Sequence, residues 1–290
     1  MIGLPVFSET LQWNKQLAKT PNSFSLMTYN AASFHPDRYN KFTGDEINNQ
    51  RVFTWFKQIE QPDIFCIQEF FNGYENNNES TLDTIRQIGN YSYYYLNPQY
   101  QRKYDGFFGV ATFSKFKAIG SGELLFGRST INKGVYNDFI IHADTIRIVN
   151  IHLSSMSIRI IPSFSIGVKN WFSLNVVNTY NKLIEGFENH ISEIDYIYKF
   201  ISESPYKVII CGDFNSFPYN YPYQKIKSSY QNSFEQRGRG LGITYHYKPF
   251  FGRIDQIFFD PAIKNLSFKV HTENPWSDHY PISAEFEVEK

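Results

Sequence analysis

Polar side chains suited to metal binding and acid–base chemistry recur in this 290-residue sequence where short apolar runs end. Five of them directly follow such runs, namely Asn30, Glu69, His152, Asp213 and Asn215. Asp255 lies inside an apolar run near the carboxyl end, and Asp278 and His279 directly precede the last run. Strand ends that converge on one edge of a sheet can bring such distant residues into a single site.

Together these carboxylate, amide and imidazole groups suit the hydrolysis of a phosphate ester. A hard cation such as Mg²⁺ takes oxygen ligands and needs few of them from the protein. Attack by water needs a base or an orienting carboxylate, and the charge that develops on the phosphoryl group needs cations or hydrogen-bond donors. Each residue alone has an ordinary structural explanation, such as a turn at Asp213 after Gly212, so the prediction depends on the whole set.

The surrounding sequence alternates short apolar runs with polar loops and a few amphipathic segments, which predicts the strands and helices that must position these side chains. Runs such as Val208-Ile209-Ile210 are apolar on both faces and predict strands buried on both sides, so we expect two packed sheets with helices outside. Strands are expected at 24–29, 64–68, 91–95, 109–113, 135–141, 145–151, 207–211, 253–259 and 282–288, and helices at 45–58, 81–88 and 177–203.

Composition supports a globular chain and limits its partners. Hydrophobic residues make up 42% and charged residues 19%, with a formal net charge of zero. Proteins that hold long stretches of duplex DNA are usually basic, so this balance weighs against extended DNA binding.

No apolar run is long enough to span a bilayer, and the start lacks the features of a signal peptide. Cys66 and Cys211 are expected to be buried hydrophobic residues.

Seven short motifs occur in the order typical of one enzyme superfamily. They are Thr28-Tyr29-Asn30, Ile67-Gln68-Glu69, Gly109-Val110-Ala111-Thr112-Phe113-Ser114-Lys115, Asn150-Ile151-His152-Leu153, Gly212-Asp213-Phe214-Asn215-Ser216, Arg253-Ile254-Asp255 and Ser277-Asp278-His279-Tyr280-Pro281. The chain therefore resembles the endonuclease/exonuclease/phosphatase superfamily, the DNase I-like fold, over nearly everything from Phe24 onward.

The resemblance implies a four-layered α/β/β/α sandwich over residues 23–290, after a lead-in segment at 1–22. It also implies Mg²⁺ as cofactor, with Mn²⁺ as a substitute, held mainly by Glu69 with Asn30 and Asp278 nearby.

For catalysis, the resemblance implies that Asp213 orients or deprotonates water and that Asp255 supports the imidazole of His279. Asn215 and His152 would contact the phosphate, and Arg253 is expected to bind substrate. Which group is the general base stays open, because family members differ on it.

The chain departs from the branch of the superfamily that acts on abasic DNA. That branch typically carries an Asp where Ala32 stands, a Lys near Phe70-Phe71 and a Tyr near Phe107-Phe108. A nucleic acid, a nucleotide or a phospholipid headgroup remain alternative substrates. A non-catalytic binding module that kept the fold is the alternative function, although such a module has no chemical need for the full set of polar residues.

Other segments leave their role open. Residues 154–178 are rich in apolar side chains and contain no acidic residue, so they form either a membrane-facing or substrate-facing lip or ordinary packing against the sheet. The glycine-rich stretch at 238–242 is either a phosphate-contacting loop or a flexible turn, and residues 245–248 either line the substrate cleft or form an edge strand. We expect a monomer that is soluble as given, with the soluble domain of a longer membrane-attached protein as an open alternative.

Overall fold

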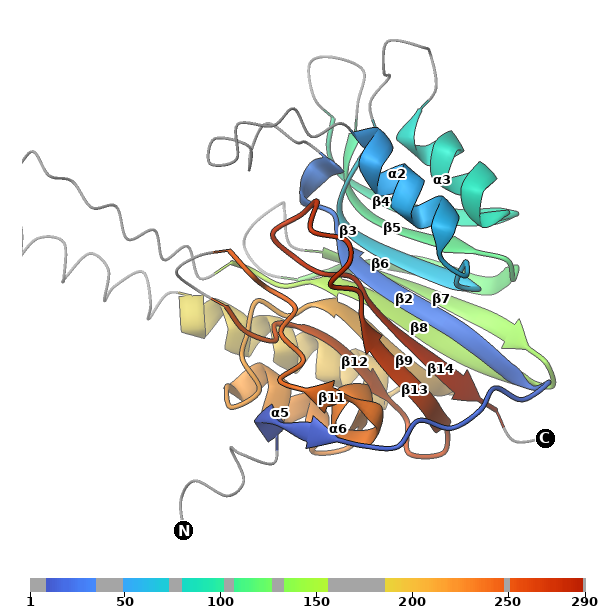
Figure 1. Cartoon of the computed structure of the whole chain (residues 1–290). Coiled ribbons are helices and arrows are strands. Elements are labelled where there is room, and N and C mark those ends of the chain that lie inside the picture. The colour runs from blue at the N-terminus through green and yellow to red at the C-terminus, as the bar shows by residue number, and fades with distance from the viewer. Residues whose placement is uncertain are drawn as a thin grey trace, which may run out of the picture.

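A computed structural model of the chain describes residues 9–34, 49–72, 80–101, 107–126, 133–155, 186–247 and 251–288. Within these residues two six-stranded sheets pack face to face, and helices cover the outer face of each sheet (Figure 1). This is the four-layered α/β/β/α sandwich that the family resemblance implies, and it confirms the two packed sheets expected from the apolar runs. A two-stranded ribbon lies to one side, made of β1 (Gln12–Trp13) and β11 (Arg239–Gly240).

The first sheet carries most of the residues expected to act on substrate. Its strands, in spatial order, are β10 (Gln231–Asn232), β12 (Asp255–Phe259), β9 (Lys207–Asp213), β8 (Asp144–His152), β7 (Lys133–Ile141) and β6 (Ala118–Leu125). The second sheet has the order β13 (Lys264–Val270), β14 (Ile282–Glu287), β2 (Ser23–Asn30), β3 (Ile64–Asn72), β5 (Phe107–Ser114) and β4 (Tyr93–Gln101).

The helices form the two outer layers and bury their apolar stripes against the sheets. On the second sheet lie α2 (Asn49–Gln58) and α3 (Thr81–Gly89). On the first sheet lie the helix at 186–202 and α5 (Tyr221–Lys227). Ile194, Ile197 and Ile201 of the long helix are fully buried, at the spacing of one helical face. Two further short helical elements are η1 (Ala32–Phe34) and α6 (Ser233–Arg237).

The space between the sheets changes from apolar to polar toward one edge. Side chains of the central strands such as Leu26, Ile148 and Ile209 fill its middle, and Cys66 and Cys211 lie there as buried free thiols, as the sequence predicts. Nearer the edge, Gln68 on β3 bridges the sheets, because its Nε2 donates to Thr28 Oγ1 at 2.9 Å and to Asn150 Oδ1 at 2.5 Å. Each residue in this bridge is fully buried.

Most expected strands occur with shifted ends, and two long ones were not expected. The strand expected at 91–95 begins at Tyr93 and runs to Gln101, and the strand expected at 64–68 continues to Asn72. β6 and β13 are additional strands. Of the helix expected at 45–58, residues 49–58 are helical and 45–48 lie outside the described residues. Of the helix expected at 177–203, the described part is helical over 186–202.

Candidate active site

Three neighbouring strands place His152, Asp213 and Asp255 in one row at the polar edge of the first sheet. The parallel register of β8 and β9 pairs His152 with Asp213, and the antiparallel register of β12 and β9 pairs Asp255 with Asp213. Paired residues on adjacent strands point to the same face. The row therefore lies on the face of the first sheet that packs against the second sheet, as do Ile148, Cys211 and Ile257 of the same strands.

Gly212 allows β8 and β9 to approach each other closely just before Asp213. Its φ of 136° is one that side chains rarely adopt, and a Cβ atom there would lie 2.0 Å from the carbonyl oxygen of Ile151. Only glycine fits this backbone. The sequence Gly212-Asp213 is thus a packing requirement of the site rather than a plain turn.

The imidazole of His279 is held between two carboxylates. Its Nδ1 lies 2.8 Å from Asp255 Oδ2, and its Nε2 lies 3.8 Å from Asp213 Oδ2. Burial opposes the charged ring, but the carboxylates of Asp255, Asp213 and Asp278 outweigh it and hold the pKa of His279 well above its ordinary value. The pairing with Asp255 fixes which ring nitrogen faces the site.

Asp213 is the buried centre of the cluster. Its Oδ1 accepts from the backbone N–H of Asn215 at 2.8 Å, and its Oδ2 accepts from Asn30 Nδ2 at 3.0 Å. Burial raises its pKa, while the imidazoles of His279 and His152 lower it. His152 Nε2 lies 3.6 Å from Asp213 Oδ2, slightly beyond hydrogen-bond distance, so the imidazoles of His152 and His279 both converge on this carboxylate.

Asn215 completes this part of the site from the loop after β9. Its φ of 46° is in the left-handed region, and its Nδ2 donates to the Leu153 carbonyl at 2.9 Å and to Asp213 Oδ2 at 3.3 Å. A residue held in such a conformation is often functional. Here the amide ties the end of β8 to the end of β9.

The expected metal ligands lie beside this cluster. Glu69 interrupts β3 at a bulge, with a φ of 48°, so it does not follow the strand end as expected but projects from within a longer strand. Its Oε1 lies 4.0 Å from His152 Nε2. Burial and then the nearby Glu69 carboxylate raise the pKa of Asp278, against the lowering effect of His279. Carboxylate oxygens such as these are the ligands that a divalent cation like Mg²⁺ takes.

A second combination of groups could also hold a metal. Ligand atoms of Asp213, Asp255 and His279 lie within 4.8 Å of one another. Two of these side chains, His279 and Asp255, are already linked by a hydrogen bond at 2.8 Å, which is typical of an acid–base pair. Mg²⁺ prefers oxygen ligands and keeps several waters, so the more open Glu69 side chain, 22% exposed, and Asp278 suit it better.

Arg253 is not brought to this cluster. It is 4% exposed, and its guanidinium donates to Gln256 Oε1 at 2.7 Å and to the Glu9 carbonyl at 2.6 Å. It also lies over the ring of Phe234, 4.3 Å from the centroid. These contacts join the lead-in segment to β12 and α6, which is a structural role.

Tyr245, in the segment for which the sequence left cleft lining and an edge strand as alternatives, lies beside His279. Its backbone pairs with His279 and Gly252 in isolated bridges, and its ring makes an edge contact with the His279 ring at 5.0 Å. Burial, and then the charges of Asp278 and Asp213, raise its pKa to about 12. Only the aromatic run at 245–248 pointed to it in the sequence, and such a run is equally typical of an edge strand.

Ser277 is a residue whose role sequence reasoning missed. Its Oγ donates to the carbonyl of Asn30 at 2.8 Å and accepts from the backbone N–H of His279 at 3.1 Å. It therefore joins the end of β2 to the loop that carries Asp278 and His279. The predicted lip at 154–178 cannot be placed in the same way, because 156–178 lie outside the described residues.

Most of the chain matches the model of a known family. The model of the Endonuclease/Exonuclease/phosphatase family matches residues 27–279. The chain belongs to the endonuclease/exonuclease/phosphatase family. Members of this family hydrolyse phosphoesters. No curated protein matches the chain in sequence.

Solved structures of this family share the fold. A family member from Bacteroides vulgatus aligns with a TM-score of 0.66 and 18% identity, over 93% of this chain and 100% of that one. ANGEL2, described as a 2',3'-cyclic phosphatase and solved with adenosine-2',3'-vanadate, aligns with a TM-score of 0.63 and 16% identity, over 96% and 100% of the two chains. The human Nocturnin catalytic domain with bound sulfate aligns with a TM-score of 0.58 and 15% identity, over 94% of this chain and 97% of that one. Within the described residues, no helix is both long and apolar enough to cross a bilayer.

Proposed function

We propose that this member of the family is a Mg²⁺-dependent hydrolase that cleaves a phosphoester bond by water attack. The observation that carries the proposal is the convergence of His152 and His279 on the buried carboxylate of Asp213, with Asp255 behind His279. Burying so many ionisable groups is costly unless they are paired or functional. A binding module would have no need of that arrangement.

In the proposed reaction Asp213 accepts the proton of the attacking water. Its carboxylate is fixed by Asn30 and Asn215, so it is oriented before substrate arrives. His279, kept protonated by its carboxylate neighbours, donates a hydrogen bond or a proton to a phosphoryl or leaving oxygen. His152 contacts the same phosphoryl group from the other side.

Glu69 and Asp278 would hold the metal ion, with the Asn30 amide close by. When bound, Mg²⁺ would polarise the phosphoryl oxygens and offset the negative charge that builds up on them. The Asn30 amide has a second task, because its Oδ1 also accepts from the Ala32 backbone N–H at 3.1 Å. This bond fixes the orientation of the amide toward Asp213.

Hydrogen-bond donors for the phosphate are few among the described site residues, which gives Tyr245 a role. The amides of Asn30 and Asn215 are both directed at Asp213, and Arg253 lies elsewhere. The Tyr245 hydroxyl is protonated at neutral pH, as an ordinary tyrosine is, and its pKa of about 12 keeps it a donor in alkaline solution as well. We propose that it binds a phosphoryl oxygen of the substrate.

An aromatic surface beside the site favours a substrate with a flat ring, such as a nucleotide or a nucleic-acid end. Phe217 and Tyr219 follow Asn215 and stack on each other with centroids 6.5 Å apart and an interplanar angle of 18°. Both are exposed, and Phe217 packs over Gly252, the bridge partner of Tyr245. Exposed aromatic rings next to a phosphate site can stack a base.

A substrate panel with Mg²⁺ tests this proposal. Bis(4-nitrophenyl) phosphate, a 2',3'-cyclic nucleotide, single-stranded RNA, duplex DNA with and without an abasic site, sphingomyelin and a phosphoinositide would be compared for wild type and Asp213→Asn. We expect hydrolysis of the generic diester and of the nucleotide substrates, abolished by EDTA. Preferential cleavage of a lipid would contradict the choice of substrate, and no hydrolysis of any member by a folded protein would favour the binding module.

A further inference from the structure

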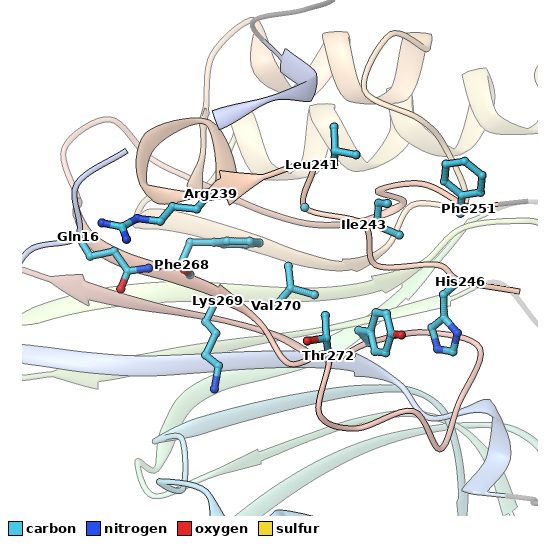
Figure 2. Close-up of a pocket in the computed structure, with 12 residues that line it drawn as sticks. Gln16, Arg239, Leu241, Ile243, His246, Phe251, Phe268, Lys269, Val270 and Thr272 are labelled. Carbon is cyan, nitrogen blue, oxygen red and sulfur yellow. Dashed lines mark hydrogen bonds between the residues drawn. The ribbon is translucent and has the colours of Figure 1, made fainter. Parts of the chain in front are cut away.

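A groove of about 620 Å³ lies between β13 and the segment after β11 (Figure 2). Phe268 and Val270 of β13 form one wall, and Leu241 and Ile243 of the segment after β11 form the other. Pockets that hold small molecules typically enclose about 300–1,000 Å³ and are mainly apolar. The groove therefore has the size and the lining of a ligand site.

The groove is separate from the catalytic cluster, although the two share a wall. That wall is the pair of segments 244–246 and 278–280, joined by bonds from His246 N to the Asp278 carbonyl at 3.0 Å and from Tyr280 N to the Thr244 carbonyl at 2.7 Å. Neighbouring side chains of extended segments point to opposite faces. Tyr245 contacts His279 on the catalytic side, whereas His246 stacks on Tyr280 at 4.0 Å on the groove side.

The charge of the groove lies at one end. Its lining includes Arg239 and Lys269 and no acidic residue. Lys269 forms an ion pair with Glu273 at 2.9 Å and points away from the groove in Figure 2. Arg239 lies beside Gln16 at the end away from His246, and its Nε donates to a backbone carbonyl, that of Asn14, at 3.2 Å. No carboxylate pairs with Arg239 within the described part of the chain.

Two apolar side chains of this lining face solvent. Leu241 is 49% exposed and Phe251 is 67% exposed. A ligand with an apolar body would cover them together with Val270 and Phe268, which is favourable in proportion to the apolar area removed from water. A negative group on that ligand would gain charge-assisted hydrogen bonds from the guanidinium of Arg239.

We propose that this groove binds a small anionic ligand with an apolar body, its negative group at Arg239 and its apolar part between β13 and residues 241–243. The ligand is a different molecule from the reacting phosphoester, because the shared wall separates the two sites.

Binding of 8-anilinonaphthalene-1-sulfonate, followed by fluorescence in EDTA without substrate, tests the proposal independently of any catalytic activity. N-phenyl-1-naphthylamine, which has the same rings without the sulfonate, is the neutral control. We expect one saturable site that prefers the sulfonate by about tenfold, the effect of a charge-assisted hydrogen bond. Arg239→Gln should abolish that preference and leave the affinity for the neutral probe unchanged.

Leu241→Asp should lower the affinity for both probes by about tenfold or more, because it places a charge in the apolar wall of the groove. This side chain is half exposed, so the variant should fold, and an unchanged thermal unfolding midpoint would confirm it. Leu125→Asp, the same change at a side chain 60% exposed on β6, is the matched control and should bind as wild type does. Absence of saturable binding, equal affinity for the two probes, or wild-type binding by Leu241→Asp would each overturn the proposal.

Discussion

Replacing Asp255 by Asn tests the link between the first sheet and the catalytic imidazole. The change keeps the shape of the side chain but removes the charge that lies 2.8 Å from His279 Nδ1 in a site where both residues are almost fully buried. A hydrogen bond to a charged group contributes about 1.5–3 kcal/mol, so we expect kcat to fall by about ten- to a hundredfold.

The pKa of His279 should fall in the same variant, because one of the carboxylates that raise it loses its charge. With Mg²⁺ and bis(4-nitrophenyl) phosphate, the alkaline limb of the kcat profile should therefore move to lower pH. The direction follows from the requirement for a protonated imidazole, which a lower pKa restricts to more acidic solution.

A double-mutant cycle separates this coupling from an indirect effect on the fold. His279→Ala alone should cost about 10²–10⁴-fold in kcat, and adding Asp255→Asn should then cost little more, since the two act as one unit. Asp138→Asn is the control, because Asp138 pairs with Arg147 at 2.7 Å in a buried ion pair on β7 and β8 and should affect stability without affecting kcat. Equal losses from Asp255→Asn in both backgrounds would refute the proposed pairing.

Three further changes test other parts of the site. Tyr245→Phe should lower kcat about tenfold or more on the generic diester without changing the Mg²⁺ requirement, and unchanged turnover would exclude the hydroxyl as a phosphate ligand. Gln68→Leu should lower the free energy of unfolding in urea by about 1–3 kcal/mol and also lower kcat, because Glu69 follows it directly; a stability loss without a kcat loss would separate the inter-sheet bridge from catalysis. Arg253→Met should lower the free energy of unfolding by about 2–4 kcal/mol while the folded fraction keeps its kcat, and a selective rise in KM would instead support a role in substrate binding.

The layered fold follows from local signals in the sequence. Runs such as Val208-Ile209-Ile210 are apolar on both faces, and in the structure they are buried between a helical layer and the second sheet. Strand β6 was missed because its burial alternates between exposed and half-buried positions over most of its length and it contains Gly120 and Gly122. Strand β13 was missed because it lies at the edge of its sheet and mixes Lys and Ser with apolar residues.

The site itself was only partly predictable. His152, Asp213 and Asp255 were found because motifs mark them, and the strand registers then explain why they lie together. The contacts of Arg253 depend on Glu9 and Gln256, which come from other parts of the chain, so no local pattern could show them. The position of Tyr245 depends on its bridge to His279, which is likewise a tertiary contact.

The most direct test of the account is the rate at which Asp213→Asn hydrolyses a phosphodiester that wild type cleaves in Mg²⁺. Asp213 is 1% exposed and accepts from the N–H groups of Asn30 and Asn215, so its isosteric replacement keeps the volume of the side chain but removes the proton acceptor. A thermal unfolding midpoint close to that of wild type would show that the variant is folded. The account predicts a turnover about 10²–10⁴-fold below wild type, and no turnover for wild type in EDTA. Near wild-type turnover by Asp213→Asn, or hydrolysis that persists in EDTA, would contradict it.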